Sequence, residues 1–226
     1  GLKEVLIPGE LESVIKLSDE AKKRAKQHRL HVCQFLDGRQ ISNQPMPRDY
    51  TTKTLTGKVK LWDVASPVRY LLRTELRLDG QVVDENEQYI GFKHLAWQRN
   101  GFFLNGRRLN IRGLIRHQSY PYVGYAMPES MQRYDARILK EELSLNAVRA
   151  AYGPHSQYFI DECDAIGLLF FMEIPGWRHI GDEKWKDTAI SNVKEMIEQY
   201  RNHPSVAIWG VRISGSKDCD DFYEKT

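Results

Sequence analysis

The sequence has few cysteines, and they are not arranged as a disulfide framework. Three occur among 226 residues, at Cys33, Cys163 and Cys219, widely spaced and without a CxxC pair. A sparse, odd-numbered set argues against a disulfide scaffold and favours a reducing compartment. We therefore expect a cytoplasmic protein.

Long hydrophobic runs and charge of one sign are also scarce. No stretch of 18 apolar residues occurs, so we expect no membrane contact through a spanning helix. No signal-peptide pattern opens the chain, and a start at Gly1 suggests a processed or recombinant product. The formal net charge of +3 gives no electrostatic case for nucleic acid. The one basic run, Lys22 to Arg29, is better interpreted as a solvated loop or hairpin tip than as a nucleic-acid or targeting patch.

Several chemical motifs are missing too. The sequence has no Gly-rich phosphate loop and no evident Ser–His–Asp arrangement, and His155, His179 and His203 share no metal-ligand spacing. We therefore expect no cofactor and no metal, and we interpret His203 as structural. The apolar content of 41% and charged content of 28% are typical of a globular protein.

The first 95 residues show short alternating strands separated by turn signals, with no good amphipathic helix. The dipeptides Asp37-Gly38 and Asp79-Gly80 each divide two alternating runs. Asp-Gly in that position is a strong signal for a β-hairpin. The pattern predicts a small antiparallel β-sandwich.

From about residue 96 strands and helices alternate. We predict strands over residues 109–115, 146–151, 168–174 and 205–213. Helical spacing between them predicts one helix with Met131, Tyr134, Ile138 and Leu139 on one face, and a second that ends at Gly167. A third helix carries an apolar stripe formed by Trp185, Ala189, Val193, Met196, Ile197 and Tyr200. This alternation implies a parallel sheet with right-handed crossovers.

Three long segments resemble glycoside hydrolase family 2, the β-galactosidase and β-glucuronidase family. GFFLNGRRLNIRGLIRHQSYPYVG (101–124) looks like the segment that leads into that family's barrel. NAVRAAYGPHSQYFIDECDAIGLLFF (146–171) is similar to its first signature, and RNHPSVAIWGVRISGS (201–216) to its second. The resemblance covers the whole chain. It implies an immunoglobulin-like β-sandwich over residues 1–95, followed over 96–226 by α/β structure, the N-terminal half of a (β/α)8 TIM barrel with four βα units.

The resemblance implies retaining hydrolysis of a β-glycosidic bond, which needs two carboxyl groups about 5–5.5 Å apart. In this family both are Glu residues, at the C-terminal ends of barrel strands four and seven, on the rim where such barrels carry their active sites. Because residues 96–226 hold only four predicted strands, we expect the nucleophile's strand to be absent from the chain. We also expect the family's usual N-terminal jelly-roll domain to be absent.

Two rim positions depart from the family pattern. The second signature places Asn-Glu after WGVRI, where this chain has Ser214 and Gly215. The acid/base position therefore has no side chain, and we predict that no catalytic residue is intact. The first signature expects His where Tyr152 stands, and Ser119 stands where relatives often have an acidic residue. These losses lie at strand ends, which favours a repurposed or redesigned site as much as simple inactivity.

Five rim residues remain candidates for substrate binding: His117, Arg149, Tyr152, Glu173 and Trp177. By resemblance, His117 would touch the sugar and Arg149 would orient the missing nucleophile. Glu173 either lines the pocket or forms an ion pair with Arg149. Trp177, in a rim loop, could stack on a sugar ring.

Other residues with suggestive chemistry have plainer interpretations. Trp209 lies in an apolar strand, where core packing is favoured over sugar stacking. Asp218, Asp220 and Asp221 follow the fourth strand, and such a cluster more often begins a helix than replaces a lost catalytic acid.

The preferred hypothesis is a segment of a family 2 glycoside hydrolase that is inactive by itself. The alternatives are a non-enzymatic carbohydrate-binding or assembly module, and an engineered scaffold in which Ala150, Ala151, Gly153, Ser214 and Gly215 open a pocket for another ligand. Four parallel strands alone would leave two unpaired edges. We therefore expect a homo-oligomer or binding to a complementary half-barrel, with a β-glycoside as the carbohydrate ligand.

Overall fold

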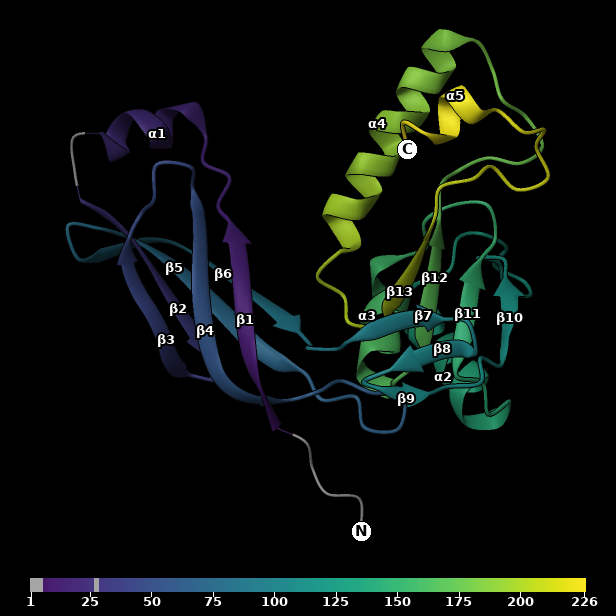
Figure 1. Cartoon of the computed structure of the whole chain (residues 1–226), viewed down its shortest axis with the longest axis horizontal. Helices are drawn as coiled ribbons and strands as arrows, with labels where there is room; N and C mark the ends of the chain where they lie inside the picture. The colour runs from purple at the N-terminus through teal and green to yellow at the C-terminus, as the bar shows by residue number, and fades with distance from the viewer. Residues whose placement is uncertain (1–5, 27–28) are drawn as a thin grey trace. The chain divides into compact units, whose positions relative to one another are not determined.

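The computed structural model describes residues 6–26 and 29–226, which form two compact units (Figure 1). The first unit is the chain up to Leu61 together with Val68–Phe92. The second unit is Trp62–Pro67 together with Lys93–Thr226. The short segment Trp62–Pro67 is thus built into the second unit although the residues on both sides of it belong to the first.

The first unit is a sandwich of two antiparallel sheets. One sheet pairs β1 (Leu6–Val14) with β4 (Thr51–Lys60). The other has the order β3-β2-β5-β6, made of β2 (Leu30–Leu36), β3 (Arg39–Pro45), β5 (Tyr70–Leu78) and β6 (Gln81–Ile90). Apolar residues from both sheets meet in one core, at Leu36, Val59, Leu72 and Ile90 with Ile7, Leu11 and Ile41 packed against them. The predicted antiparallel sandwich is confirmed.

Both predicted hairpins form at their Asp-Gly dipeptides. Asp37 and Gly38 have φ values of 47° and 78°, and Asp79 and Gly80 have 49° and 90°. Positive φ at both central residues defines the two-residue turn whose twist matches that of paired strands. Nothing lies within 4 Å of a Cβ built on Gly38 or Gly80, so these glycines are required by backbone conformation alone.

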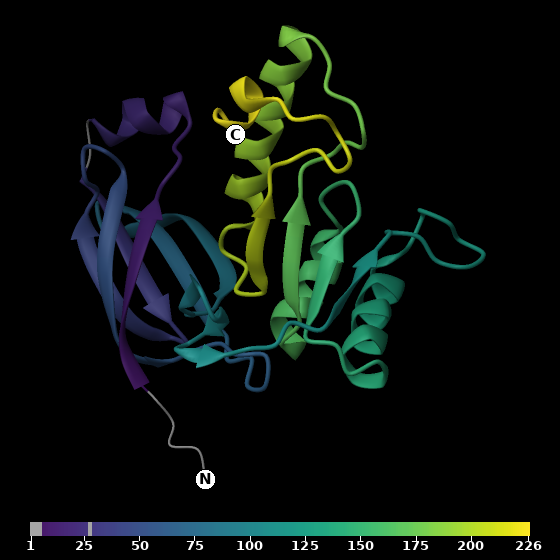
Figure 2. The ribbon, with the colours of Figure 1, turned by 45° about the vertical axis from the view of Figure 1, so that its right-hand side comes forward.

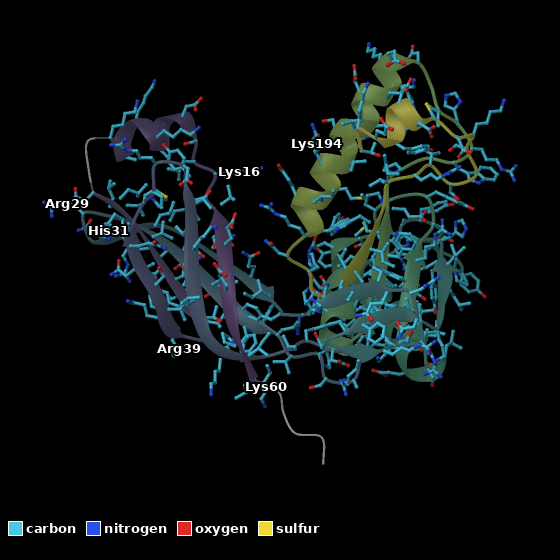
Figure 3. All side chains as sticks on the ribbon, in the orientation of Figure 1. Lys16, Arg29, His31, Arg39, Lys60 and Lys194 are labelled. Atoms are coloured by element: carbon cyan, nitrogen blue, oxygen red, sulfur yellow. The ribbon has the colours of Figure 1, made fainter. Side chains whose placement is uncertain are left out.

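The helix α1 (Asp19–Ala25) was not predicted. Its first turn carries Asp19 and Glu20. Their negative charges stabilise the helix by interacting with the partial positive charge at its N-terminus. The interpretation of Lys22–Arg29 as a loop or hairpin tip was therefore wrong for Lys22 to Ala25, while residues 27 and 28 lie outside the described part. In Figure 3 the labelled Lys16 and Arg29 lie toward one end of the sandwich, and Arg39 and Lys60 toward the other.

The second unit begins with a small antiparallel sheet and continues with the parallel one. The small sheet contains β7 (Leu95–Gln98), β8 (Gly101–Leu104) and β9 (Arg107–Arg108). The parallel sheet has the order β10-β11-β12-β13, visible in Figure 2, from β10 (Gly113–Arg116), β11 (Ala147–Ala150), β12 (Leu169–Glu173) and β13 (Val206–Gly210). The four predicted strands exist, but 109–112 and 211–213 are not strand.

Helices connect the parallel strands, as predicted. They are α2 (Glu129–Arg137), continued by a π-helical turn over Ile138–Glu142, α3 (Gln157–Ile166) and α4 (Glu183–Tyr200), and α5 (Asp220–Tyr223) follows β13. The stripe on α4 is confirmed by the buried Ala189, Val193, Met196 and Tyr200. Gly167 ends α3 with φ 77°, and a Cβ there would lie 2.6 Å from the Val64 carbonyl oxygen.

The predicted face of α2 is confirmed at Leu139, which is buried, and wrong at Tyr134, which is exposed. Gln132 and Ala136 are buried although they were not predicted. The reason is a buried arginine at the end of β10, because Arg116 donates a hydrogen bond of 3.0 Å from Nη2 to Gln132 Oε1. The spacing of apolar residues cannot predict that a polar residue such as Gln132 lies on the buried face of a helix.

The two faces of the parallel sheet differ in their cover. Val148, Ala150, Phe170 and Met172 point into a core shared with α2, α3 and α4. On the opposite face the strand register aligns Ile115, Arg149, Phe171 and Ile208 in one row across all four strands. That face borders an open cavity of about 310 Å³, so the described elements of this unit leave it partly uncovered.

Cys33, Cys163 and Cys219 are free thiols, the first two buried. Burial raises the pKa of the Cys163 thiol well above its usual value. Among the described residues, no helix combines the length and apolar character needed to cross a bilayer.

Candidate functional site at the ends of the parallel strands

The candidate site lies where the four parallel strands end. Because parallel strands all point the same way, the residues that follow them meet at one edge of the sheet. Glu173 is the last residue of β12, and the other three strands end at Arg116, Ala150 and Gly210. Among these four terminal positions, Glu173 is thus the one carboxylate.

Glu173 is buried and paired with Arg149. Its Oε1 accepts a hydrogen bond from Arg149 Nε, an ion pair between neighbouring strands. Glu173 is 3% exposed, whereas the Arg149 side chain is 38% exposed, so the pair reaches from the interior to the open face of the sheet. Gly210 makes room for it, because a Cβ there would lie 2.8 Å from Glu173 Cγ.

Three aromatic rings follow one another along the rim. The His117 and Tyr152 rings meet edge to face with centroids 5.5 Å apart, and the Tyr152 and Trp177 rings are tilted with centroids 5.8 Å apart. Trp177 is 51% exposed. Tyr152 adopts a left-handed φ of 59°, which is uncommon for a residue other than glycine and is enriched at functional sites. The row therefore presents apolar ring surface to solvent.

The structure thus links the five predicted substrate-binding residues in two groups. His117, Tyr152 and Trp177 are joined through ring contacts, and Arg149 and Glu173 through their ion pair. The three contacting pairs are 35, 25 and 24 positions apart in the sequence (117 to 152, 152 to 177 and 149 to 173), and they meet because successive parallel strands end at one edge of the sheet.

The position that the family resemblance assigns to the acid, Gly215, lies beside the ring row. Its φ is 70°, and a Cβ built on it would lie 3.1 Å from Cγ of Arg178. The Arg178 guanidinium lies over the Trp177 ring, 4.3 Å from its centroid. The backbone is fixed here, because Arg178 N–H donates to the Ser214 carbonyl at 2.8 Å.

A buried histidine supports the rim from beneath. His155 is 3% exposed, with Nδ1 3.2 Å from the Gly153 carbonyl oxygen and Nε2 3.1 Å from that of Arg116. Burial, reinforced by the nearby Arg116 charge, lowers the pKa of His155 from its usual 6.5 to about 4. The imidazole is therefore neutral at pH 7, and its one N–H donates to one of these two carbonyls.

A cluster of Asp161, Asp164 and His203 has ligand atoms within 4.8 Å of one another, which is close enough to hold a metal. Both oxygens of Asp164 are already engaged, however: Oδ1 accepts from Ser205 N–H at 2.8 Å and Oδ2 contacts His203 Nδ1 at 2.6 Å. The Trp62 indole also donates to the Asp164 carbonyl at 2.8 Å. We assign this cluster a structural role at the approach to β13, as predicted for His203.

Several plainer interpretations are confirmed and one is corrected. Trp209 packs against the core beneath the helices. Asp220 and Asp221 lie in the first turn of α5. Ala150, however, is fully buried in the helix-side core, so its small side chain opens no space at the rim. The proposed pocket of small residues is wrong on that point, because strand alternation turns position 150 away from the open face.

Two contributors to the site were missed at the sequence level. Arg178 is a lone cation after Trp177, and only the fold brings it over the indole and against Gly215. Gly210 was passed over inside an apolar run, although it accommodates Glu173. A glycine within a strand is a signal of close approach that could have been used.

The parallel strands, their connecting helices and the site at the strand ends are consistent with part of a TIM-barrel domain, which follows the antiparallel sandwich in the sequence. Residues 95–220 match the family model described as "Glycosyl hydrolases family 2, TIM barrel domain", and residues 9–93 match that of "Glycosyl hydrolases family 2". The chain belongs to glycosyl hydrolase family 2.

Named relatives agree with this assignment. A β-galactosidase of Thermoanaerobacterium thermosulfurigenes is 50% identical over 166 residues, which are 74% of this chain and 23% of that protein. A β-galactosidase of Rhizobium meliloti is 37% identical over 74% of this chain and 22% of its own length. The structure of Bacteroides uniformis β-glucuronidase 3 superposes with a TM-score of 0.69, at 32% identity, covering 81% of this chain and 24% of that one. The chain thus spans about a quarter of the length of these relatives.

Proposed function

We propose that this chain is a segment of a family 2 glycoside hydrolase, made of a sandwich domain over residues 1–95 and the first four βα units of a barrel over residues 96–226. In this proposal its rim is part of a β-glycoside-binding site. The support is the four-stranded parallel sheet and the convergence of His117, Arg149, Tyr152, Glu173 and Trp177 at its carboxyl edge.

The segment hydrolyses no β-glycoside by itself. The retaining mechanism needs two facing carboxyl groups, and Glu173 is the one carboxylate at the ends of the four parallel strands. Its charge is engaged by Arg149, and the assigned acid position, Gly215, offers no proton donor. The proposal rests on Gly215, which has a left-handed backbone conformation and no side chain that could act as the acid.

The decisive test is turnover of aryl β-galactosides and β-glucuronides by the purified chain. The expected rate equals the uncatalysed background, with a complete family 2 β-galactosidase as positive control. The Glu173→Gln variant should behave as the parent does. Turnover by the parent that disappears in this variant would show that Glu173 acts catalytically and that the proposal of inactivity is wrong.

A carbohydrate-binding role without catalysis is the second candidate, favoured by the exposed Trp177 ring beside Tyr152. Exposed aromatic rings can cover the apolar face of a sugar. Calorimetric titration with β-methyl glycosides should give saturable heat that the Trp177→Ala variant loses. Trp97→Ala is the matched control, because Trp97 is also exposed, 62%, but lies on β7. Loss of binding in both variants, or no binding by the parent, would count against this role.

The open face of the parallel sheet is proposed to be covered by further strands, from a second copy or a complementary half-barrel. Leu114 and Ile115 on the edge strand β10 are 52% and 56% exposed, and a row containing Ile115 borders the 310 Å³ cavity. Exposed apolar strand edges tend to pair with other chains.

Light scattering coupled to gel filtration tests this proposal. We expect a dimer at micromolar concentration that Ile115→Lys converts to monomer. Leu55→Lys is the control, since Leu55 is 74% exposed on β4 of the sandwich. A parent chain that stays monomeric at high micromolar concentration would contradict self-association and leave the complementary half as the expected partner.

A further inference from the structure

Two hydrogen-bond donors lie beside the missing side chain of Gly215. A Cβ built there would be 3.7 Å from Arg178 Nε and 3.8 Å from Trp177 Nε1. Both nitrogens carry N–H groups that can donate but not accept. They border the position that a Cβ at residue 215 would take, and Arg178 Cγ, 3.1 Å from that position, borders it as well.

Neither donor has a protein acceptor among the described residues. The Trp177 indole N–H makes no hydrogen bond there, and the Arg178 side chain makes neither a hydrogen bond nor an ion pair, only its stacking contact of 4.3 Å on the Trp177 ring. Both residues are exposed. An arginine whose guanidinium carbon lies over an indole ring keeps N–H groups at its edge that a ligand can reach.

Two other arginines of this unit have carboxylate partners, whereas Arg178 has none among the described residues. Arg149 is paired with Glu173, and Arg212 is paired with Asp218 through a contact of 2.5 Å between Nη2 and Oδ1. No carboxylate of the described residues lies within ion-pair distance of Arg178. The space above Gly215 is therefore bounded by two donors and one uncompensated charge.

The backbone holds these groups in place. Arg178 N–H donates to the Ser214 carbonyl at 2.8 Å, and Trp177 and Ser214 form a β-bridge. Arg178 itself has a φ of 59°, a conformation that is costly for a non-glycine residue unless the surroundings hold it. The donors thus belong to a fixed junction between the loops that follow β12 and β13.

We propose that the space above Gly215 binds a small carboxylate group, with Arg178 and the Trp177 indole N–H as its donors. A planar, singly charged carboxylate matches a guanidinium edge and accepts several hydrogen bonds at once. The site depends on this geometry and not on the glycosidase assignment, so it can fail while that assignment stands.

The test is a titration of the ¹⁵N-labelled full chain with sodium acetate, followed through the Trp177 indole and Arg178 Nε signals. Ionic strength is held constant with sodium chloride, and acetamide serves as the uncharged isostere. We expect saturable shifts of both signals with acetate at about millimolar concentrations, since so small a ligand has few atoms to bind through. Acetamide and chloride should give no saturable shift. Equal shifts with chloride would overturn the proposal, because they would show only screening.

Variants separate the two donors from general surface charge. Arg178→Gln should weaken acetate binding by about tenfold or more, the loss expected when a charge-assisted hydrogen bond is removed. Trp177→Phe keeps a ring, removes the N–H and identifies the indole signal. Arg99→Gln is the matched control, because Arg99 is exposed in the same unit on the turn between β7 and β8. Equal weakening by Arg99→Gln and Arg178→Gln would contradict a specific site.

A last comparison distinguishes a free acid from a sugar acid as the source of the carboxylate. Glucuronate and glucose are titrated beside acetate. Tighter binding of glucuronate than acetate, with none of glucose, would identify a sugar acid. Equal binding of glucuronate and acetate would identify the carboxylate alone. Binding of glucose as strong as that of glucuronate would show that the carboxylate is not what the site recognises.

Discussion

The two units of this chain differ in the residues that fill their cores. The sandwich core contains four fully buried or nearly buried apolar residues together with buried polar ones, where Gln34 hydrogen-bonds Ser13 and Thr54 at 2.9 Å and 2.8 Å. The second unit buries a larger apolar cluster between its parallel sheet and its helices. Apolar burial therefore contributes more to the stability of the second unit, while both units also bury polar residues.

The units also differ in how their strands find one another. In the sandwich, two-residue turns bring β2 onto β3 and β5 onto β6. In the second unit each parallel pairing needs a crossover through a helix. Crossovers deliver strand ends from distant parts of the sequence to one edge, which is where the candidate site forms. The comparison teaches that local turns specify the scaffold of the first unit, whereas long-range packing specifies the second.

The largest effect should follow from removing Trp62, which is completely buried and packs with Phe102, Leu104 and Leu169. Trp62→Ala should lower the free energy of unfolding of the second unit by about 3–5 kcal/mol, through lost burial and a cavity. All five tryptophans lie in that unit, so the fluorescence of the remaining four reports urea unfolding of it alone.

The control for this experiment is Trp97→Ala, since Trp97 is largely exposed. It should cost no more than about 1 kcal/mol, as surface substitutions do. Equal losses for the two variants would refute the claim that Trp62–Pro67 is an integral part of the second unit.

Acid should destabilise the second unit through His155. The unfolded chain's imidazole binds a proton near pH 6.5, but the folded one does so only near its pKa of about 4. Between these values the unfolded state holds more protons, so stability is complete above pH 6.5 and falls as the pH drops toward 4. The loss should reach roughly 3 kcal/mol.

The measurement is the free energy of unfolding from tryptophan fluorescence at pH values between 4 and 7. His155→Gln should flatten this part of the curve, whatever its stability at pH 7. A variant that kept the full slope of the parent would show that other groups cause the acid sensitivity.

The smallest effect should come from a turn of the sandwich. A Cβ added at Gly80 would meet no atom within 4 Å, so Gly80→Ala causes no clash. It does force alanine to adopt a φ of 90°, and this strain should lower the free energy of unfolding of the sandwich by about 1 kcal/mol. Circular dichroism should show a lower melting temperature for the sandwich while tryptophan fluorescence is unchanged. A change in the fluorescence transition would mean that the two units do not unfold independently.

The sequence alone determined the elements that depend on local chemistry. Asp-Gly dipeptides predicted both hairpins, Gly167 predicted the end of α3, and the apolar stripe predicted α4. Motif similarity predicted the family and the two kinds of domain. The hairpins, the end of α3 and the helix α4 can be predicted because each depends on residues close together in the sequence. The family can be predicted because its motifs are long continuous segments.

Tertiary structure decided what depends on groups far apart in the chain. It turned Gln132 toward the core through its bond to Arg116, paired Arg149 with Glu173, and drew the segment Trp62–Pro67 into the second unit. It also placed Arg178 and the Trp177 indole around Gly215. No periodicity in the sequence encodes these contacts, because they form only when separate strands and loops reach the same edge of the sheet.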